Sequence, residues 1–145
     1  MKAIIFDYNR TIYNPENSSV FPGAIDLIQE YKNAGFKIFM VAKGGNERRE
    51  QVADLNISYY FEKIVIEPEK TKEDFIDIMR ECEKDTEFYV VGDRARKEIK
   101  FGNQCGMTTI WFRKGKFASE DPEEEIERPD YIIDELEEIK EIIKV

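Results

Sequence analysis

Three acidic residues and a lysine lie close after apolar segments of this sequence, at positions where they could act together. Asp7 comes directly after one apolar segment, Gly92-Asp93 ends another, and Glu98 lies five residues beyond Asp93. Lys70 lies in a polar stretch that follows a third. Carboxylate oxygens suit Mg²⁺, which usually keeps several waters and completes its shell with a substrate phosphate. The set therefore indicates a magnesium site for a phosphorylated ligand, in which the lysine balances part of the negative charge.

Each of these signals also has a plain structural explanation. A single aspartate after a strand is usually a turn former or a helix cap, and Gly-Asp is common in loops. Their joint occurrence, in order, at successive apolar segments favours a site. The chain contains no histidine, which excludes a histidine general base, histidine-dependent zinc sites and any Ser-His-Asp triad.

Strand-length apolar segments alternate with segments of helical period along the whole chain. Strands are expected at residues 2–6, 36–42, 61–66, 87–91, 107–112 and 131–133, and helices at 22–34, 46–56, 71–83, 95–104 and from a cap at Asp134 to the C-terminus. This alternation predicts an α/β fold, a three-layer Rossmann-like sandwich with a central parallel sheet of about five strands and helices on both faces. Ligands of such sheets bind beyond the carboxyl ends of the strands, where the strand order reverses. We therefore expect the acidic residues to meet at that edge.

Length and charge narrow the class of protein. The chain of 145 residues has the size of one ordinary domain, and we expect residues 1–145 to form it. No apolar run approaches the roughly 20 residues of a membrane span. The net charge of −9 argues against a nucleic-acid scaffold, which needs a basic face. The chain enters a strand directly, without a signal peptide, which predicts a cytoplasmic protein.

Two further features are expected to have structural and not functional roles. Cys82 and Cys105 fall on predicted helices, far apart in the sequence, and are expected to be buried thiols in a reducing compartment. The acidic run from Glu120 to Glu127 is expected to be a solvated loop, although the segments 94–100 and 113–116 are basic.

The segments that carry these residues resemble the haloacid dehalogenase-like (HAD) superfamily of phosphohydrolases over nearly the whole chain. The similar segments are IIFDYNRTI, FPGAIDLIQEYKNAGFKIFMVAKGG, EKTKEDFIDIM, YVVGDRARKEIKFGNQCGMTTIWF and RPDYIIDELEEIKEII. The fourth, with its Gly-Asp and its later acid, is the most specific. The resemblance implies a HAD-like catalytic core with a Mg²⁺ cofactor and a phosphorylated substrate.

The resemblance also assigns roles to individual residues. It implies that Asp7 is the nucleophile that takes the phosphoryl group as an aspartyl phosphate, a covalent route that splits one displacement into two steps. It implies that Asp93 binds Mg²⁺ together with Asp7 and the backbone carbonyl of Asn9, and that Glu98 supports the metal. Lys70 becomes the lysine that holds the phosphate, with Lys72 as the reserve choice.

The phosphate-binding positions depart from the family pattern. Thr11 matches the threonine that closes the first motif, but Ala42 stands where the second motif normally has Ser or Thr. Lys43 and the free amides of Gly44 and Gly45 could replace that contact, since a Gly-rich turn can form an anion-binding nest. A plain loop before the next helix is the equal alternative. Arg10 occupies a position where glycine is frequent, and is expected to crowd or charge the mouth of the site.

Asn9 is the more serious departure. In phosphatases of this superfamily an aspartate at this position protonates the leaving group and later activates water, and an asparagine side chain cannot transfer a proton. The resemblance therefore implies a slow Mg²⁺-dependent phosphohydrolase. A non-catalytic domain that binds metal, phosphate or a protein partner is the alternative. A haloacid dehalogenase ranks last, because it needs an enclosed apolar pocket.

The segments where a cap domain would be inserted are short. About ten residues separate Thr11 from Pro22, and the segment after the second predicted strand is also short. We therefore expect no cap domain. An open site favours a phosphorylated macromolecule, or a small substrate closed off by a neighbouring subunit of a homo-oligomer.

Overall fold

The centre of the protein is a six-stranded sheet in which all strands run parallel. The computed structural model describes residues 1–145. The strands are β1 (Lys2–Phe6), β4 (Lys37–Lys43), β5 (Lys63–Glu67), β6 (Glu87–Gly92), β7 (Thr108–Phe112) and β8 (Tyr131–Ile133), in the order β5-β4-β1-β6-β7-β8. The predicted α/β fold is confirmed. The sheet has six strands where about five were expected, because the short segment 131–133 joins it as β8 by pairing with β7.

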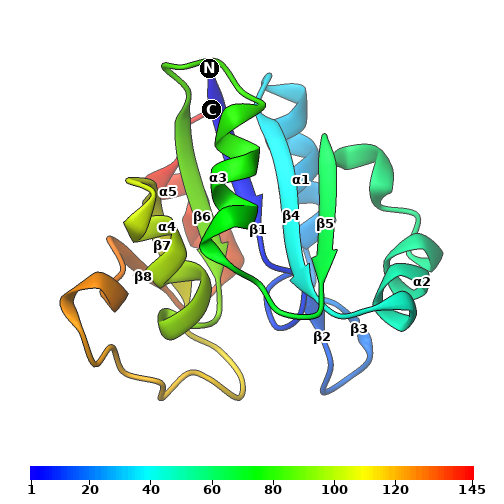
Figure 1. Ribbon diagram of the computed structural model, residues 1–145. Helices are drawn as coiled ribbons and strands as arrows, with labels where there is room; N and C mark the ends of the chain where they lie inside the picture. Colours follow the sequence, from blue (N-terminus) through cyan, green and yellow to red (C-terminus); the bar gives the residue numbers. More distant parts are fainter.

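Helices cover both faces of the sheet. They are α1 (Ala24–Asn33), α2 (Asn46–Asp54), α3 (Lys72–Arg80), α4 (Lys100–Gln104) and α5 (Ile139–Ile142). Figure 1 shows α3 and α4 in front of the sheet and α1 and α5 behind it. The residues of β1 alternate between the two layers, since Ile4 and Phe6 pack in the cluster of α1 and α5 whereas Ala3 and Ile5 pack in the cluster of α3.

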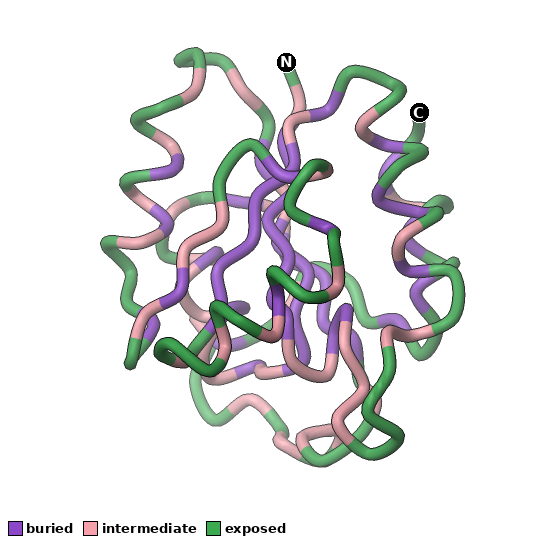
Figure 2. The backbone as a smooth tube through the Cα atoms, turned by 90° about the vertical axis from the view of Figure 1, so that its right-hand side faces the viewer, coloured by how far each residue is buried: buried purple, intermediate pink, exposed green.

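Burial follows this layering. Every strand of the sheet from β1 to β7 has buried residues, and four of the five residues of β1 are buried. In Figure 2 the buried, purple tube is concentrated in the middle of the molecule, and the outer turns of the helices are exposed. No helix of the chain is both long enough and apolar enough to cross a membrane.

The strand order reverses at β1. The chain passes from β1 to β4 and β5 on one side and then returns to β6, β7 and β8 on the other. The carboxyl ends of the strands and the loops after them lie at the lower edge in Figure 1, opposite both chain termini. A hairpin of β2 (Tyr13–Asn14) and β3 (Ser19–Val20) lies at this same edge. The sequence did not predict the hairpin, because two-residue strands are too short to show alternation.

Two expected helices differ from the prediction. The segment 95–104 begins as a π-helical turn, Ala95–Ile99, and only its second half is α-helical. The C-terminal segment is one 3₁₀ turn, Leu136–Glu138, followed by the single turn of α5. The expected cap at Asp134 is wrong, since its N–H donates to the carboxylate of Glu138 at 2.7 Å and its side chain does not cap the helix.

The cysteines are free thiols, as expected, but the expectation that they are buried is wrong. Cys82 lies just beyond the end of α3 and Cys105 just beyond the end of α4, and both are only half-buried. Helix α3 ends at Arg80, before the expected residue 83, whereas α4 ends at Gln104 as expected. The two thiols are free.

Gly102 lies where α4 packs on the sheet, and we predict that a larger residue there destabilises the fold. A Cβ at this position would lie 2.8 Å from Cγ2 of Thr109 and 2.9 Å from Cγ2 of Val90. The free-energy cost of this overpacking exceeds the stabilisation that alanine brings through its higher helix propensity. Gly102→Ala should therefore lower the free energy of unfolding by about 1 kcal/mol or more. Urea denaturation measures this, with Gln104→Ala at an exposed position of the same helix as the control. Equal stability of the two variants would contradict the packing described here.

Candidate active site

Three buried carboxylates meet at the edge where the strand order reverses. Asp7 follows β1, Asp93 follows β6, and Glu98 lies in the π-helical turn. One carboxylate oxygen of each lies within 4.8 Å of the others, and the three residues are at most 5% exposed. The parallel strands therefore bring together the acidic residues that the sequence pattern singled out.

The ammonium of Lys70 lies among these carboxylates. Its Nζ donates to Oδ1 of Asp7 at 2.9 Å and also contacts Glu98. Burial by itself lowers the pKa of Lys70, but the charges of Asp7 and Glu98 outweigh it and raise that pKa above its ordinary value. Lys72 is exposed and begins α3, away from the carboxylates. The geometry thus separates the two lysines between which the sequence left a choice.

The three carboxyl groups differ in their affinity for a proton. Burial tends to raise the pKa of Asp7, but the charge and hydrogen bond of Lys70 lower it below its ordinary value. Burial and the charges of Asp7 and Glu98 raise the pKa of Asp93 to about 9. Burial and the charge of Asp7 raise the pKa of Glu98 to about 7. One lysine is therefore too little positive charge for three carboxylates at neutral pH.

A divalent cation fits this imbalance. The donor set consists of hard carboxylate oxygens, which Mg²⁺ prefers. Oδ2 of Asp93 is buried and has no hydrogen-bond partner, and a bound cation would satisfy it. The residues present are therefore suited to hold Mg²⁺.

Backbone features keep the carboxylates in place. Gly92 makes room for Glu98, because a Cβ on residue 92 would lie 2.9 Å from Cγ of that glutamate. Nε1 of Trp111 donates to the carbonyl of Asp93 at 2.9 Å, and the N–H of Tyr8 donates to Oδ1 of Asp7 at 2.8 Å. The π-helical turn that carries Glu98 is a geometry often found at functional sites.

The other predicted site residues divide into two groups. Asn9, Lys43 and Gly44 line the cavity in front of the carboxylates, which has a volume of about 320 Å³. Thr11 and Ala42 are fully buried and do not line it, and the Thr11 hydroxyl has no hydrogen-bond partner. The structure therefore does not bring these two to the cavity.

Gly44 does not have the free amide that one of the two alternatives for this turn requires. Its N–H donates to the carbonyl of Glu67 at 2.8 Å, so it is not available to an anion. Gly44 has a φ of 152°, and a Cβ there would lie 2.4 Å from Cβ of Arg48. The glycine is needed for this close approach of the α2 side chain.

Arg10 lines the same cavity, as expected for a residue at the mouth of the site. Its φ of 62° lies in the left-handed region, which explains why glycine is frequent at this position. Its guanidinium lies over the ring of Phe117, 5.2 Å from the centroid.

The sequence missed the residues that hold the loop after β7 against the site. Arg94 lies over the ring of Phe117 at 3.8 Å and pairs with Glu120 at 2.7 Å. Glu127 is buried and accepts the N–H of Glu123 at 2.8 Å. The expectation that the acidic run is only solvated is therefore wrong for Glu120 and Glu127. The basic segment 94–100 was the signal for this pairing.

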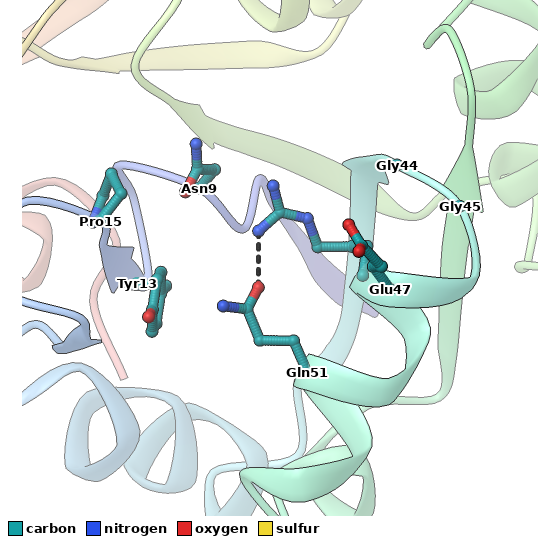
Figure 3. Close-up of a pocket in the computed structure, with 8 residues that line it drawn as sticks. Asn9, Tyr13, Pro15, Gly44, Gly45, Glu47 and Gln51 are labelled. Atoms are coloured by element: carbon teal, nitrogen blue, oxygen red, sulfur yellow. Dashed lines mark hydrogen bonds between the residues drawn. The ribbon is translucent and has the colours of Figure 1, made fainter.

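A second cavity, of about 450 Å³, adjoins the first. Figure 3 shows residues that line it, from the loop after β1, the turn after β4 and the first turns of α2. The two cavities share Asn9, Gly44 and Arg48 as lining residues. The sequence gave no sign of Arg48, because a polar residue on an exposed helix face is ordinary.

Comparisons with known proteins agree with this architecture. Residues 71–139 match the family described as HAD-hydrolase-like. The chain is 30% identical over 131 residues to glyceraldehyde 3-phosphate phosphatase of Methanopyrus kandleri, a match that covers 86% of this chain. It spans about half the length of the curated relatives it matches, 56% in that case and 54% for the Pyrococcus furiosus enzyme of the same name.

Solved structures share the fold. A HAD phosphatase from Thermococcus onnurineus superposes with a TM-score of 0.79 at 17% identity, and the match covers 99% of this chain and 98% of that one. D,D-heptose 1.7-bisphosphate phosphatase from B. bronchiseptica, complexed with magnesium and phosphate, gives a TM-score of 0.73 at 17% identity, covering 98% and 97%.

We predict that replacing the ionisable carboxyl of Asp93 stabilises the folded protein when no metal is bound. The pKa of Asp93 is about 9 in the folded protein, against about 3.9 in an unfolded chain, so the folded state keeps a proton that the unfolded state releases. The contribution of Asp93 to stability therefore falls as the pH rises from about 4 to about 9. In EDTA at pH 8, Asp93→Asn should raise the melting temperature by several degrees, and the gain should shrink toward pH 4. Asp85→Asn, at an exposed position, is the control. A lower melting temperature for Asp93→Asn at pH 8 would contradict this account.

Proposed function

The chain belongs to the haloacid dehalogenase-like (HAD) superfamily of hydrolases, and from this membership we propose that it is a Mg²⁺-dependent phosphohydrolase. The observation that carries the proposal is the contact of Lys70 with Asp7 inside a cluster of three buried carboxylates. The residues proposed as nucleophile, as countercharge for phosphate and as metal ligands line one cavity, which supports the proposal.

In the proposed first step, Asp7 attacks the phosphorus of a phosphate monoester. A bond forms between a carboxylate oxygen and phosphorus, and the bond from phosphorus to the ester oxygen breaks. Because the pKa of Asp7 lies below its ordinary value, the carboxylate is ionised and ready to attack. The Lys70 ammonium, fixed beside it, balances the charge of the incoming phosphate.

Asp7, Asp93 and the backbone carbonyl of Asn9 would hold Mg²⁺, with Glu98 in support. When bound, the ion would neutralise the excess of carboxylate charge and stabilise negative charge on the phosphoryl group. The protein's own part is to keep these oxygens preorganised through Gly92 and Trp111.

Asn9 limits the proton transfers of both steps. The leaving oxygen must depart without a proton from this residue, or take one from water. In the second step water attacks the aspartyl phosphate, releases inorganic phosphate and restores Asp7, and again no carboxylate at position 9 removes the proton of water. General acid–base catalysis is typically worth about 10²–10⁴-fold in rate. We therefore propose slow turnover, fastest for substrates with good leaving groups.

The substrate is proposed from the surroundings of the site. The relatives named glyceraldehyde 3-phosphate phosphatase make a small phosphate monoester the first class to test. The loop between β1 and α1 carries only the two-strand hairpin, and α2 begins directly after the turn that follows β4. Residues 1–145 are thus proposed to be one core domain without a cap. Its open site would accept a phosphorylated macromolecule, or a small molecule closed off by a second subunit.

A non-catalytic metal- or phosphate-binding domain is the second candidate. Asn9 in place of an acid and Ala42 in place of a hydroxyl favour it. The two candidate functions differ in whether the protein hydrolyses any phosphate ester.

We predict Mg²⁺-dependent hydrolysis of p-nitrophenyl phosphate that requires Lys70. Lys70→Ala should reduce turnover at least 100-fold, because it leaves Asp7 and the phosphate without their buried countercharge. Lys72→Ala is the matched control and should stay within about twofold of the wild type. The assay is release of p-nitrophenol with Mg²⁺ and in EDTA. Equal activity in EDTA would exclude the metal role, and no turnover by the wild type would favour the non-catalytic candidate.

We also predict that restoring an acid at position 9 accelerates the reaction. With Mg²⁺ bound, Asn9→Asp should raise turnover of an alkyl phosphate such as glycerol 3-phosphate by about 10²-fold, and that of p-nitrophenyl phosphate less, since p-nitrophenolate needs no proton to leave. The measurement is the rate of phosphate release for both substrates. An unchanged rate for both would show that the missing acid does not limit this site.

A further inference from the structure

The second cavity lies where the leaving group of a phosphate ester could extend from the carboxylate cavity. It lies next to the carboxylate cavity, and Asn9, Gly44 and Arg48 belong to the lining of both. A phosphate held at Asp7 would therefore have its ester oxygen and carbon chain within reach of this space. Figure 3 shows Tyr13, Glu47 and Gln51 around it, and Pro15 is its one hydrophobic neighbour besides the aromatic ring of Tyr13.

Arg48 brings a positive charge to this cavity without a carboxylate partner. The chain has 31 acidic residues and a net charge of −9, and most cations at the site are paired. Lys43 and Lys97 both pair with Glu69, and Arg94 pairs with Glu120. Arg48 takes part in no ion pair, although Glu47 lines the same cavity.

The guanidinium of Arg48 is held in a defined position. Its Nη1 donates to Oε1 of Gln51 at 2.8 Å, the bond drawn as a dashed line in Figure 3. Its Nε donates to the carbonyl of Lys43 at 3.3 Å, and the group lies 5.0 Å from the centroid of the Tyr8 ring, which stacks on Tyr13. A guanidinium has five N–H donors, so the remaining donors are available to a ligand.

Gly44 makes this arrangement sterically feasible. A Cβ at that position would lie 2.4 Å from Cβ and 2.9 Å from Cγ of Arg48. Arg48 is held in position, has no carboxylate partner and keeps free donors in a polar cavity. Such an arginine suits a carboxylate or a phosphate, because the guanidinium can donate to two oxygens of the anion.

We infer that the substrate carries a second anionic group, a carboxylate or a second phosphate, and that Arg48 is the residue that selects for it. This inference rests on the proposed function, since it assigns the leaving-group side of the same site. It identifies the substrate class as small phosphate monoesters with an additional negative charge. An uncharged sugar phosphate would leave Arg48 without its partner.

Binding of phosphonates tests the inference without turnover, because their carbon–phosphorus bond is not a phosphate ester. The series is propylphosphonate, 2-carboxyethylphosphonate and propane-1,3-diphosphonate, titrated by calorimetry with Mg²⁺ at pH 8. The wild type should bind one of the two doubly anionic ligands about tenfold or more tightly than propylphosphonate, as expected for charge-assisted hydrogen bonds. The tighter of the two identifies the second group as carboxylate or phosphate.

Arg48→Gln should reduce this preference to about twofold or less, by weakening the doubly anionic ligands far more than propylphosphonate. Arg49→Gln is the matched control, because it removes the same charge from the next residue of α2, whose guanidinium bonds the carbonyl of Ile66 instead. It should keep the tenfold preference. In turnover, 3-phosphoglycerate should be favoured over glyceraldehyde 3-phosphate, which has the same carbon chain with an aldehyde in place of the carboxylate.

The outcomes separate the two proposals. If propylphosphonate binds and Lys70→Ala weakens it, but neither doubly anionic ligand binds more tightly, the inference about Arg48 is wrong and the phosphate site stands. If Arg48→Gln weakens all three ligands equally, Arg48 contacts the transferred phosphate and not a second group, which also overturns the inference. If no phosphonate binds the wild type, the proposed function itself fails.

Discussion

The buried ammonium of Lys70 is the interaction on which the rest of the site depends. Three carboxylates within 4.8 Å of one another are costly to bury, and Lys70 is the one cation in direct contact with two of them. The chain fixes this lysine between β5 and α3, and a capping box of Thr71 and Asp74 begins the helix directly after it. Burial, together with the charge that remains uncompensated, raises the pKa of Asp93 and Glu98 and makes the cluster suited to a divalent cation.

The geometry that concentrates this charge comes from the parallel sheet. Since β1 and β6 are paired neighbours at the reversal of strand order, residues 7 and 93 reach the same edge from distant parts of the sequence. Local backbone features then complete the arrangement. Gly92 leaves space for Glu98, and the π-helical turn directs that side chain back toward β6. Sheet order therefore decides which elements meet, and single residues decide how closely.

Charge around the cavity is distributed differently from charge on the chain as a whole. The protein is strongly acidic, yet six cationic side chains line the carboxylate cavity: Arg10, Lys43, Arg48, Lys70, Arg94 and Lys97. Several are bound to acids that lie outside the carboxylate cluster. Arg94 pairs with Glu120, which holds the loop after β7 against the site, and Lys43 and Lys97 pair with Glu69. Arg10 and Arg48 form no such pairs and interact with aromatic rings instead. The cavity therefore presents positive charge to a ligand beside a negatively charged cluster of carboxylates.

The sequence by itself determined the α/β alternation, the positions of most strands, and the acids and the lysine that end in one site, because apolar period and residue type are local properties. It preferred Lys70 to Lys72 only through the family resemblance, since both follow the same strand and only packing shows which side chain turns inward. It also missed Arg48, the hairpin after β1, and the pairing of Glu120 with Arg94, and it left open whether the amide of Gly44 is free. Except for the hairpin, whose two-residue strands are too short to show alternation, these features depend on contacts between segments distant in sequence, whose geometry is set only when the sheet and its loops pack together. The tertiary structure alone decided them for that reason.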